Sequence, residues 1–253
     1  MPETRHAIVT GAGSGIGAAC AAALAAAHDT VSLFIHNHDE EARAAAAATK
    51  GGGATPTLIV CDVSDEASVE AAFAEAVGTN GPPSTLVNSA GVNMSGVPVR
   101  DMTLDHWRKA IGVDLTGAFL VTRAMLRACP DGASLIHISS IHAEVVRAGG
   151  ADYAAAKAGL DKMVQTVAVE EGPRGNRINA ILPGMILTPM NERAMADEDY
   201  RASLTRNIPM KRAGKPEEVA DLAVFLASDR ARYITGATIV IDGALSLLLG
   251  QGA

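Results

Sequence analysis

The chain has 253 residues, and its 21 Lys and Arg against 28 Asp and Glu give a formal net charge of -7. Hydrophobic residues make up 48% of the sequence, which is enough for a buried core and excludes a chain that is disordered by composition. The acidic balance argues against a nucleic-acid partner, and an aromatic content of 3% argues against base-stacking platforms and a membrane-interface belt. We therefore expect a core of closely packed Ala, Val, Leu and Ile and no nucleic-acid or membrane partner.

The cysteines and the N-terminal residues favour a cytoplasmic protein. Cys20, Cys61 and Cys129 lie far apart and show no CxxC spacing, so neither disulfides nor a metal site is expected, and each is interpreted as a small buried residue. The first residues show no secretory signal, and no apolar stretch reaches the roughly 18 residues of a membrane-spanning helix. The apolar run 244–249 is expected to be buried against a partner subunit.

Strand patterns alternate with helical patterns along the whole chain. Strands are predicted at 6–10, 31–35, 57–61, 85–88, 134–139, 177–182 and 238–241. Helices are predicted at 15–27, 39–49, 65–78, 103–129, 151–171 and 216–228. This alternation implies βαβ units, and therefore an α/β fold with one doubly wound, seven-stranded parallel sheet and helices on both faces. Because no linker or repeat divides the chain, we expect a single domain over residues 1–253 that binds its ligands at the carboxyl ends of the strands.

The first predicted strand ends in a glycine-rich turn, Thr10-Gly11-Ala12-Gly13-Ser14-Gly15-Ile16-Gly17, which opens a helix. Glycines let the backbone turn sharply and let a pyrophosphate approach the positive end of the helix. The alternative is a glycine-rich turn without a ligand. We take Thr10, Gly11, Ser14, Gly15, Ile16 and Gly17 as candidate cofactor-binding residues.

Further motifs follow later strands in register with this turn. They are Asn88-Ser89-Ala90-Gly91, Ser140, the pair Tyr153 and Lys157 four residues apart, and Pro183-Gly184-Met185-Ile186-Leu187-Thr188. Together with the TGxxxGxG spacing of the turn, they resemble the short-chain dehydrogenase/reductase family in its compact single-domain branch, over residues 7–243. The resemblance implies a Rossmann-like fold, an NAD or NADP cofactor and a small alcohol or carbonyl substrate. It implies that the cofactor is also contacted by Asp62, Val63, Asn88, Ala90, Gly91, Tyr153, Lys157, Pro183, Gly184, Ile186 and Thr188.

The choice between NAD and NADP depends on the end of the second strand. The position of the acidic residue that holds the ribose of NAD falls on Ile35, and His36 follows it. His36 could hold a 2′-phosphate, although an exposed histidine is more often solvated, and Ser14 stands where NADP-preferring relatives often carry a basic residue. These residues favour NADP and leave NAD open. Asp62 either meets the adenine, as the resemblance implies, or is only a helix N-terminal residue.

Tyr153 and Lys157 share one face of a predicted helix. A tyrosine is a poor base at neutral pH, but a nearby ammonium and the positive charge of an oxidised nicotinamide stabilise its phenolate. Tyr153 is therefore the predicted general acid and base, Lys157 supports it and bonds the nicotinamide ribose, and Ser140 bonds the substrate oxygen. The alternatives are an ordinary Tyr–Lys pair on an amphipathic helix, and Ser139 as the serine that braces the strand end.

One residue departs from the family pattern. Asp114 stands in the helix after the fourth strand, where relatives usually carry an Asn whose backbone bends the helix and binds a water of the proton relay. An aspartate there would pair with Lys157 and partly offset its effect on Tyr153, which predicts a working relay with an altered pH optimum. The alternative is that Asp114 copies Asn sterically. We include it among the candidate catalytic residues.

The substrate is the least defined part of the prediction. Residues 189–212 form the lid in the family, and Met185, Met190 and Met195 either line an apolar wall of the substrate site or belong to helix core. His142 is expected to touch the substrate as a wall more than as an acid. The C-terminal tail resembles those of sugar- and polyol-oxidising relatives, and the apolar long helices, with the resemblance, imply a homotetramer. A catalytically weak cofactor-binding sensor and a sugar-nucleotide epimerase or dehydratase remain open as alternatives.

Overall fold

The computed structural model describes residues 5–37, 39–94 and 96–248, and its seven strands form one parallel sheet in the order β3-β2-β1-β4-β5-β6-β7. The strands are β1 (His6–Thr10), β2 (Thr30–Ile35), β3 (Thr55–Val60), β4 (Thr85–Asn88), β5 (Ser134–Ile138), β6 (Arg177–Pro183) and β7 (Thr238–Ile241). The chain builds outward from β1 to β3 and then returns to the other side of β1 with β4. The carboxyl ends of β1 and β4 therefore form the switch point at which such sheets bind ligands.

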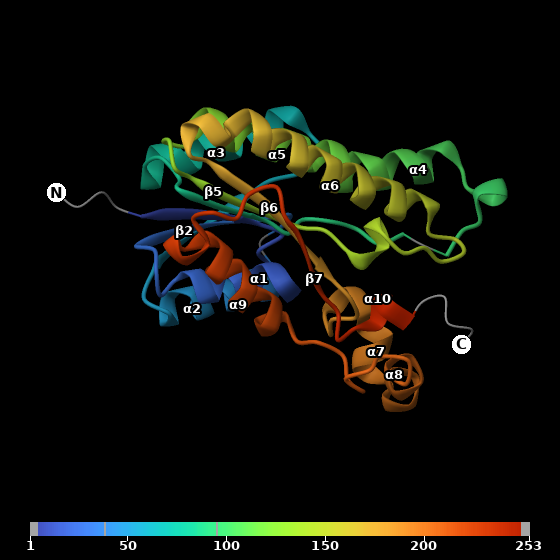
Figure 1. Ribbon diagram of the computed structural model, residues 1–253. Coiled ribbons are helices and arrows are strands. Elements are labelled where there is room, and N and C mark those ends of the chain that lie inside the picture. The colour runs from blue at the N-terminus through green and yellow to red at the C-terminus, as the bar shows by residue number, and fades with distance from the viewer. Residues whose placement is uncertain (1–4, 38, 95, 249–253) are drawn as a thin grey trace.

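Helices cover both faces of the sheet, as Figure 1 shows. One face carries α1 (Gly15–Leu24), α2 (Glu40–Gly51) and α9 (Pro216–Ala227). The other carries α3 (Glu66–Asn80), α4 (Leu104–Ile111), α5 (Ala118–Ala128) and α6 (Ala151–Glu171). Two apolar cores result, one on each face, and the fold class predicted from the strand and helix patterns is confirmed.

Small side chains allow the helices to pack closely on the sheet. On α1 the buried residues are Gly17, Cys20, Ala21 and Leu24, and α9 contributes Val219, Ala220 and Ala223 to the same core. Close approach of the helices replaces bulky aromatic packing in this core. The expectation that every cysteine is buried is wrong at Cys129, which is only partly buried.

The helix predicted over 103–129 is present from Leu104 to Ala128, with a π-helical turn, η2 (Gly112–Gly117), between α4 and α5. The turn lies where the chain passes close to the residue after β3. A Cβ on Gly117 would come within 2.9 Å of the Val63 carbonyl oxygen, so only glycine fits without a shift. The π-turn holds Asp114 in a fully buried position.

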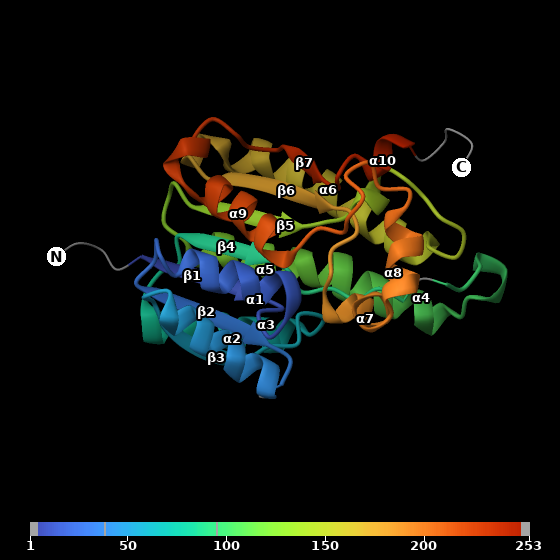
Figure 2. The ribbon, with the colours of Figure 1, turned by 90° about the horizontal axis from the view of Figure 1, so that it is seen from below.

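The carboxyl end of the sheet is extended by the segment after β6. It forms α7 (Glu192–Ala196) and α8 (Glu198–Thr205), which lie together beside α10 (Leu245–Leu248) in Figure 1 and away from the sheet layers in Figure 2. Of the run predicted to be buried against a partner, Leu249 lies outside the described residues, and the side chain of Leu247 is 76% exposed. Within the described ranges, no helix has both the length and the apolar character needed to cross a membrane.

Candidate active site

The glycine turn after β1 is packed against the turn after β4. Gly11 has a φ of +61°, and a Cβ on it would lie 2.9 Å from Ala90 Cα. A Cβ on Gly17 would overlap the Gly11 carbonyl oxygen. Because glycine has no Cβ, α1 can begin directly under the turn. Thr10 ties the two turns together, since its hydroxyl donates to Asn88 Oδ1 at 2.6 Å and accepts from the backbone N–H groups of Ser89 and Ala90.

The N-terminus of α1 has the character of an anion site. Ser14 occupies the N-cap position but makes no capping hydrogen bond, and the first turn contains no acidic side chain. Backbone N–H groups at this end of the helix have no side-chain cap, so a phosphate is a suitable acceptor for them. Thr188 borders the turn, since its side chain would be 3.3 Å from a Cβ on Gly15. These residues fit the pyrophosphate of a dinucleotide.

The remaining predicted cofactor residues also lie at the carboxyl ends of the strands. Val63 follows β3, and Asn88, Ala90 and Gly91 end or follow β4. On the other side, Pro183 ends β6, and Gly184 and Ile186 follow it towards Thr188. A Cβ on Gly184 would meet Asp242 at 2.6 Å, and Ile186 is buried. The fold therefore brings residues from β1, β3, β4 and β6 to one edge.

The end of β2 presents His36 to solvent, while Ile35 is buried. Asp62 is also exposed and lies close enough to His36 to interact with it electrostatically. Hydrogen bonds from the Ser64 side chain and backbone lower the pKa of the Asp62 carboxyl. Asp62 is not the residue that caps the next helix, because the N-cap of α3 is Asp65.

Lys157 lies at the centre of the proposed chemistry. It is buried on α6, and its Nζ is 3.1 Å from Asp114 Oδ1 and donates to the Ile138 carbonyl oxygen at 3.3 Å. Asp114 also accepts from the Val92 N–H at 3.2 Å. A Cβ on Gly91 would lie 2.6 Å from Asp114 Oδ1, so this glycine leaves the room that the carboxylate needs.

The electrostatics of this pair follow from burial and proximity. Burial raises the pKa of the Asp114 carboxyl, and the Lys157 ammonium opposes that shift. Burial lowers the pKa of Lys157, but the oxygens of Tyr153 and Asp114 outweigh it and raise that pKa overall. Lys157 is therefore held as an ammonium beside the tyrosine.

Tyr153 faces Lys157, whose Nζ is 5.4 Å from the centre of the Tyr153 ring. Its hydroxyl makes no hydrogen bond within the described chain and is not fully buried, so it is open to a substrate. Ser140 is anchored nearby, since its Oγ accepts from the His142 N–H at 3.1 Å and its own proton stays free to donate. Ser139, the alternative serine, is buried and donates its backbone N–H to the Ile181 carbonyl oxygen.

A buried histidine behind the site was not singled out from the sequence. His137 on β5 joins Asn88 Nδ2 at 3.2 Å and Thr122 Oγ1 at 3.3 Å, and burial lowers its pKa to about 4. The neutral ring thus braces Asn88, which in turn holds Thr10. The sequence indicates this bracing role only by the presence of a histidine within an apolar strand.

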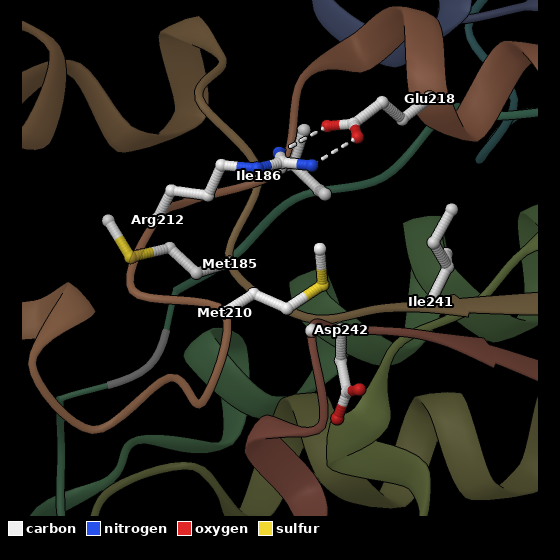
Figure 3. A pocket seen from close by; sticks show the side chains of 9 residues that line it. Met185, Ile186, Met210, Arg212, Glu218, Ile241 and Asp242 are labelled. Atoms are coloured by element: carbon white, nitrogen blue, oxygen red, sulfur yellow. Dashed lines mark hydrogen bonds and ion pairs between the residues drawn. The ribbon is translucent and has the colours of Figure 1, made fainter.

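The base of the segment 189–212 is clamped by an ion pair. Arg212 donates through two nitrogens to the Glu218 carboxylate at 2.8 and 2.7 Å, as Figure 3 shows. The same figure shows Met185 and Met210 at a pocket of about 80 Å³ beside this pair, which is too small for a substrate. Met190 and Met195 are 54% and 49% exposed, so the helix-core alternative is wrong for both.

Comparison with known proteins agrees with this geometry. A family model described as Enoyl-(Acyl carrier protein) reductase matches residues 11–246. Glucose 1-dehydrogenase 2 of Bacillus subtilis is 34% identical over 97% of this chain and 96% of its own, and 3beta-hydroxysteroid dehydrogenase 1 of Eggerthella lenta is 37% identical over 96% and 94%.

Solved structures give the same result. A short-chain dehydrogenase/reductase from Serratia marcescens matches with a TM-score of 0.90 and 33% identity, covering 97% of this chain and 100% of that chain. A blue fluorescent protein from a metagenomic library, solved in complex with NADPH, matches with a TM-score of 0.88 and 32% identity over 95% and 97%. The chain belongs to the short-chain dehydrogenase/reductase family. It is accordingly an NAD(P)-dependent oxidoreductase that acts on the CH–OH group of its substrate.

Proposed function

We propose that the protein interconverts a secondary alcohol and a carbonyl compound with Tyr153 as general acid and base. The observation that carries this proposal is the open Tyr153 hydroxyl beside the buried Lys157 ammonium, with its Nζ 5.4 Å from the ring centre. When bound at the glycine turn, a nicotinamide cofactor supplies or accepts the hydride. The chain itself holds the substrate oxygen and moves the proton.

Each side chain then has a separate task. Ser140 donates its free proton to the substrate oxygen and orients it, while the hydrogen bond that its Oγ accepts from the His142 N–H holds the hydroxyl in place. Tyr153 gives its proton to a carbonyl oxygen or takes one from an alcohol. Lys157 stabilises the phenolate and, with Asp114, forms the inner end of the proton path.

The test of this function is the conservative variant Tyr153→Phe. Loss of general acid–base catalysis is expected to reduce kcat by a factor of about 10² to 10⁴, while the variant still shows a thermal shift with NADP or NAD. Wild-type turnover would be read at the absorbance of the reduced nicotinamide over a panel of alcohols and ketones. Unchanged turnover in Tyr153→Phe would contradict the assignment, and binding without turnover by the wild type would favour the sensor.

We also propose NADP as the preferred cofactor, with NAD as the alternative. No carboxylate ends β2 to repel a 2′-phosphate, and the exposed His36 can donate a hydrogen bond to one. The neighbouring Asp62 carboxylate works against this. The ratio of kcat/KM for NADP to that for NAD should exceed one and should fall in His36→Ala; a wild-type preference for NAD would overturn the assignment.

The segment 189–212 is proposed as the substrate lid of a single domain over residues 1–253. Two exposed methionines on it, Met190 and Met195, support contact with a substrate or cofactor on closure. A sugar or polyol is the proposed substrate, supported by the similarity to the glucose dehydrogenase. In limited proteolysis, we expect bound cofactor to protect this segment from cleavage.

A homotetramer in the cytoplasm is proposed from surface character and cysteine chemistry. Phe119 on α5, Val169 on α6 and Leu247 are 46%, 80% and 76% exposed, which supports burial against other subunits. The three cysteines are free, which supports a reducing compartment. Light scattering is expected to give the mass of a tetramer, and a monomer at working concentration would contradict the assembly.

A further inference from the structure

His142 lies beside the proposed acid and base and has one nitrogen already used. Its ring packs edge-to-face against Tyr153, with 6.1 Å between ring centres and an angle of 74° between the planes. His142 Nδ1 lies 3.2 Å from the Val145 carbonyl oxygen. A carbonyl oxygen can only accept, so Nδ1 must carry the proton.

The other ring nitrogen is therefore defined by elimination. Burial lowers the pKa of His142, the hydrogen bond to the Val145 carbonyl oxygen opposes this shift, and the positive charge of Arg147 adds to it, so the pKa is lowered overall and the ring is neutral at pH 7. A neutral imidazole with its proton on Nδ1 has only a lone pair on Nε2. Nε2 makes no hydrogen bond with any described residue and is not fully buried, so it is open to a ligand.

The backbone holds this arrangement in place. His142 lies in a short 3-10 turn, Ile141–Ala143, and Ser140 is the N-cap of that turn, because Ser140 Oγ accepts from the His142 N–H. A substrate whose reacting oxygen lies between Ser140 and Tyr153 therefore has its neighbouring carbon close to His142. Only a group that donates a hydrogen bond can satisfy Nε2 there.

We propose that His142 is a specificity-determining residue that accepts a hydrogen bond from a hydroxyl on the carbon next to the reacting carbon. The preferred substrates are thus vicinal diols or α-hydroxy carbonyl compounds. This inference rests on the proposed alcohol–carbonyl activity and narrows its substrate class.

The probes are three cyclic alcohols that differ in one group: 1,2-cyclohexanediol, 2-methoxycyclohexanol and cyclohexanol. The methyl ether keeps the oxygen but cannot donate, so it separates hydrogen bonding from size. For the wild-type enzyme, kcat/KM for the diol is expected to exceed that for both other probes by about tenfold, the effect of one buried hydrogen bond.

Three variants separate the two nitrogens of the ring. His142→Asn keeps a donor near the Val145 carbonyl oxygen and leaves no acceptor at the position of Nε2, and His142→Phe keeps the ring against Tyr153 and removes both nitrogens. In both variants the ratio of kcat/KM for the diol to kcat/KM for cyclohexanol should fall by about tenfold. His142→Gln, whose side-chain oxygen reaches the position of Nε2, should keep most of the preference.

Two results would overturn the inference. One is a wild-type enzyme that turns over cyclohexanol or its methoxy derivative as well as the diol. The other is a preference that is the same in His142→Asn and His142→Gln, since a purely structural role for the ring would not separate these variants. If the wild type turns over none of the alcohols or the corresponding ketones with either cofactor, the proposed function itself fails, and this inference fails with it.

Discussion

Replacing Asp114 with Asn removes a negative charge from beside the Lys157 ammonium and keeps an oxygen acceptor at the same place. The pair is buried, with 3.1 Å between Lys157 Nζ and Asp114 Oδ1. A carboxylate there offsets part of the stabilisation that Lys157 gives to the Tyr153 phenolate. The neutral amide does not, so the phenolate should form at lower pH in Asp114→Asn.

The size of the effect follows from the distances. Lys157 Nζ is 3.1 Å from Asp114 Oδ1 and 5.4 Å from the Tyr153 ring centre, so the carboxylate lies within roughly 9 Å of the centre of the ring over which the phenolate charge is spread. At that separation and an effective dielectric constant of about 20, two unit charges interact by about 2 kcal/mol. Since one pH unit corresponds to about 1.4 kcal/mol, the rising limb of the pH–rate profile should move down by about one unit.

The assay is kcat for alcohol oxidation between about pH 6 and about pH 10, where the rate rises as the tyrosine loses its proton. Asp105→Asn is the matched control, since it removes the same charge from a side chain that is 95% exposed on α4 and should leave the profile unchanged. An unmoved midpoint in Asp114→Asn would show that Asp114 only copies the shape of Asn. A shift to higher pH would show that the charge reasoning has the wrong sign.

The remaining predictions concern stability, measured as the free energy of unfolding in urea. Gly17→Ala should lower the free energy of unfolding by about 1 to 3 kcal/mol and abolish the thermal shift given by NADP, because the added Cβ overlaps the Gly11 carbonyl oxygen. Gly78→Ala on α3 has open space for its Cβ and should raise the free energy of unfolding by about 0.5 to 1 kcal/mol. Similar losses in both variants would refute the role of this overlap. Burial raises the folded-state pKa of Asp161 to about 6, so the buried carboxylate destabilises the folded state increasingly as pH rises above 3.8. Asp161→Asn should therefore raise the free energy of unfolding by up to about 3 kcal/mol at pH 8 but by little at pH 4. Burial lowers the folded-state pKa of His137 to about 4 from 6.5, so the wild type should lose up to about 3 kcal/mol as pH falls through that interval; an equal acid loss in His137→Asn would contradict this.

The sheet was predictable because its strands are local apolar runs bounded by turn residues. β1, β4 and β7 begin and end where the pattern places them, and α6 matches its predicted bounds. The helix over 103–129 was predictable from its pattern, and a bend at Asp114 was expected only from the family resemblance. The close approach of Gly117 to the Val63 carbonyl oxygen was not predictable, because periodicity along one helix contains no information about a residue that follows a distant strand.

Residue types in the site were likewise easier to predict than the atoms they leave open. The sequence identifies Lys157 and His142 as polar residues near the reaction, but the backbone carbonyls that bind them come from the last residue of β5 and from the loop that follows it. The Ile138 carbonyl oxygen accepts from Lys157 Nζ, and the Val145 carbonyl oxygen fixes the proton on His142 Nδ1. Because a carbonyl oxygen only accepts, the first bond fixes the position of Lys157 Nζ and the second leaves a lone pair on His142 Nε2. The same short segment thereby sets the proton chemistry and the demand for a donor on the substrate, so changes to its backbone path should alter both together.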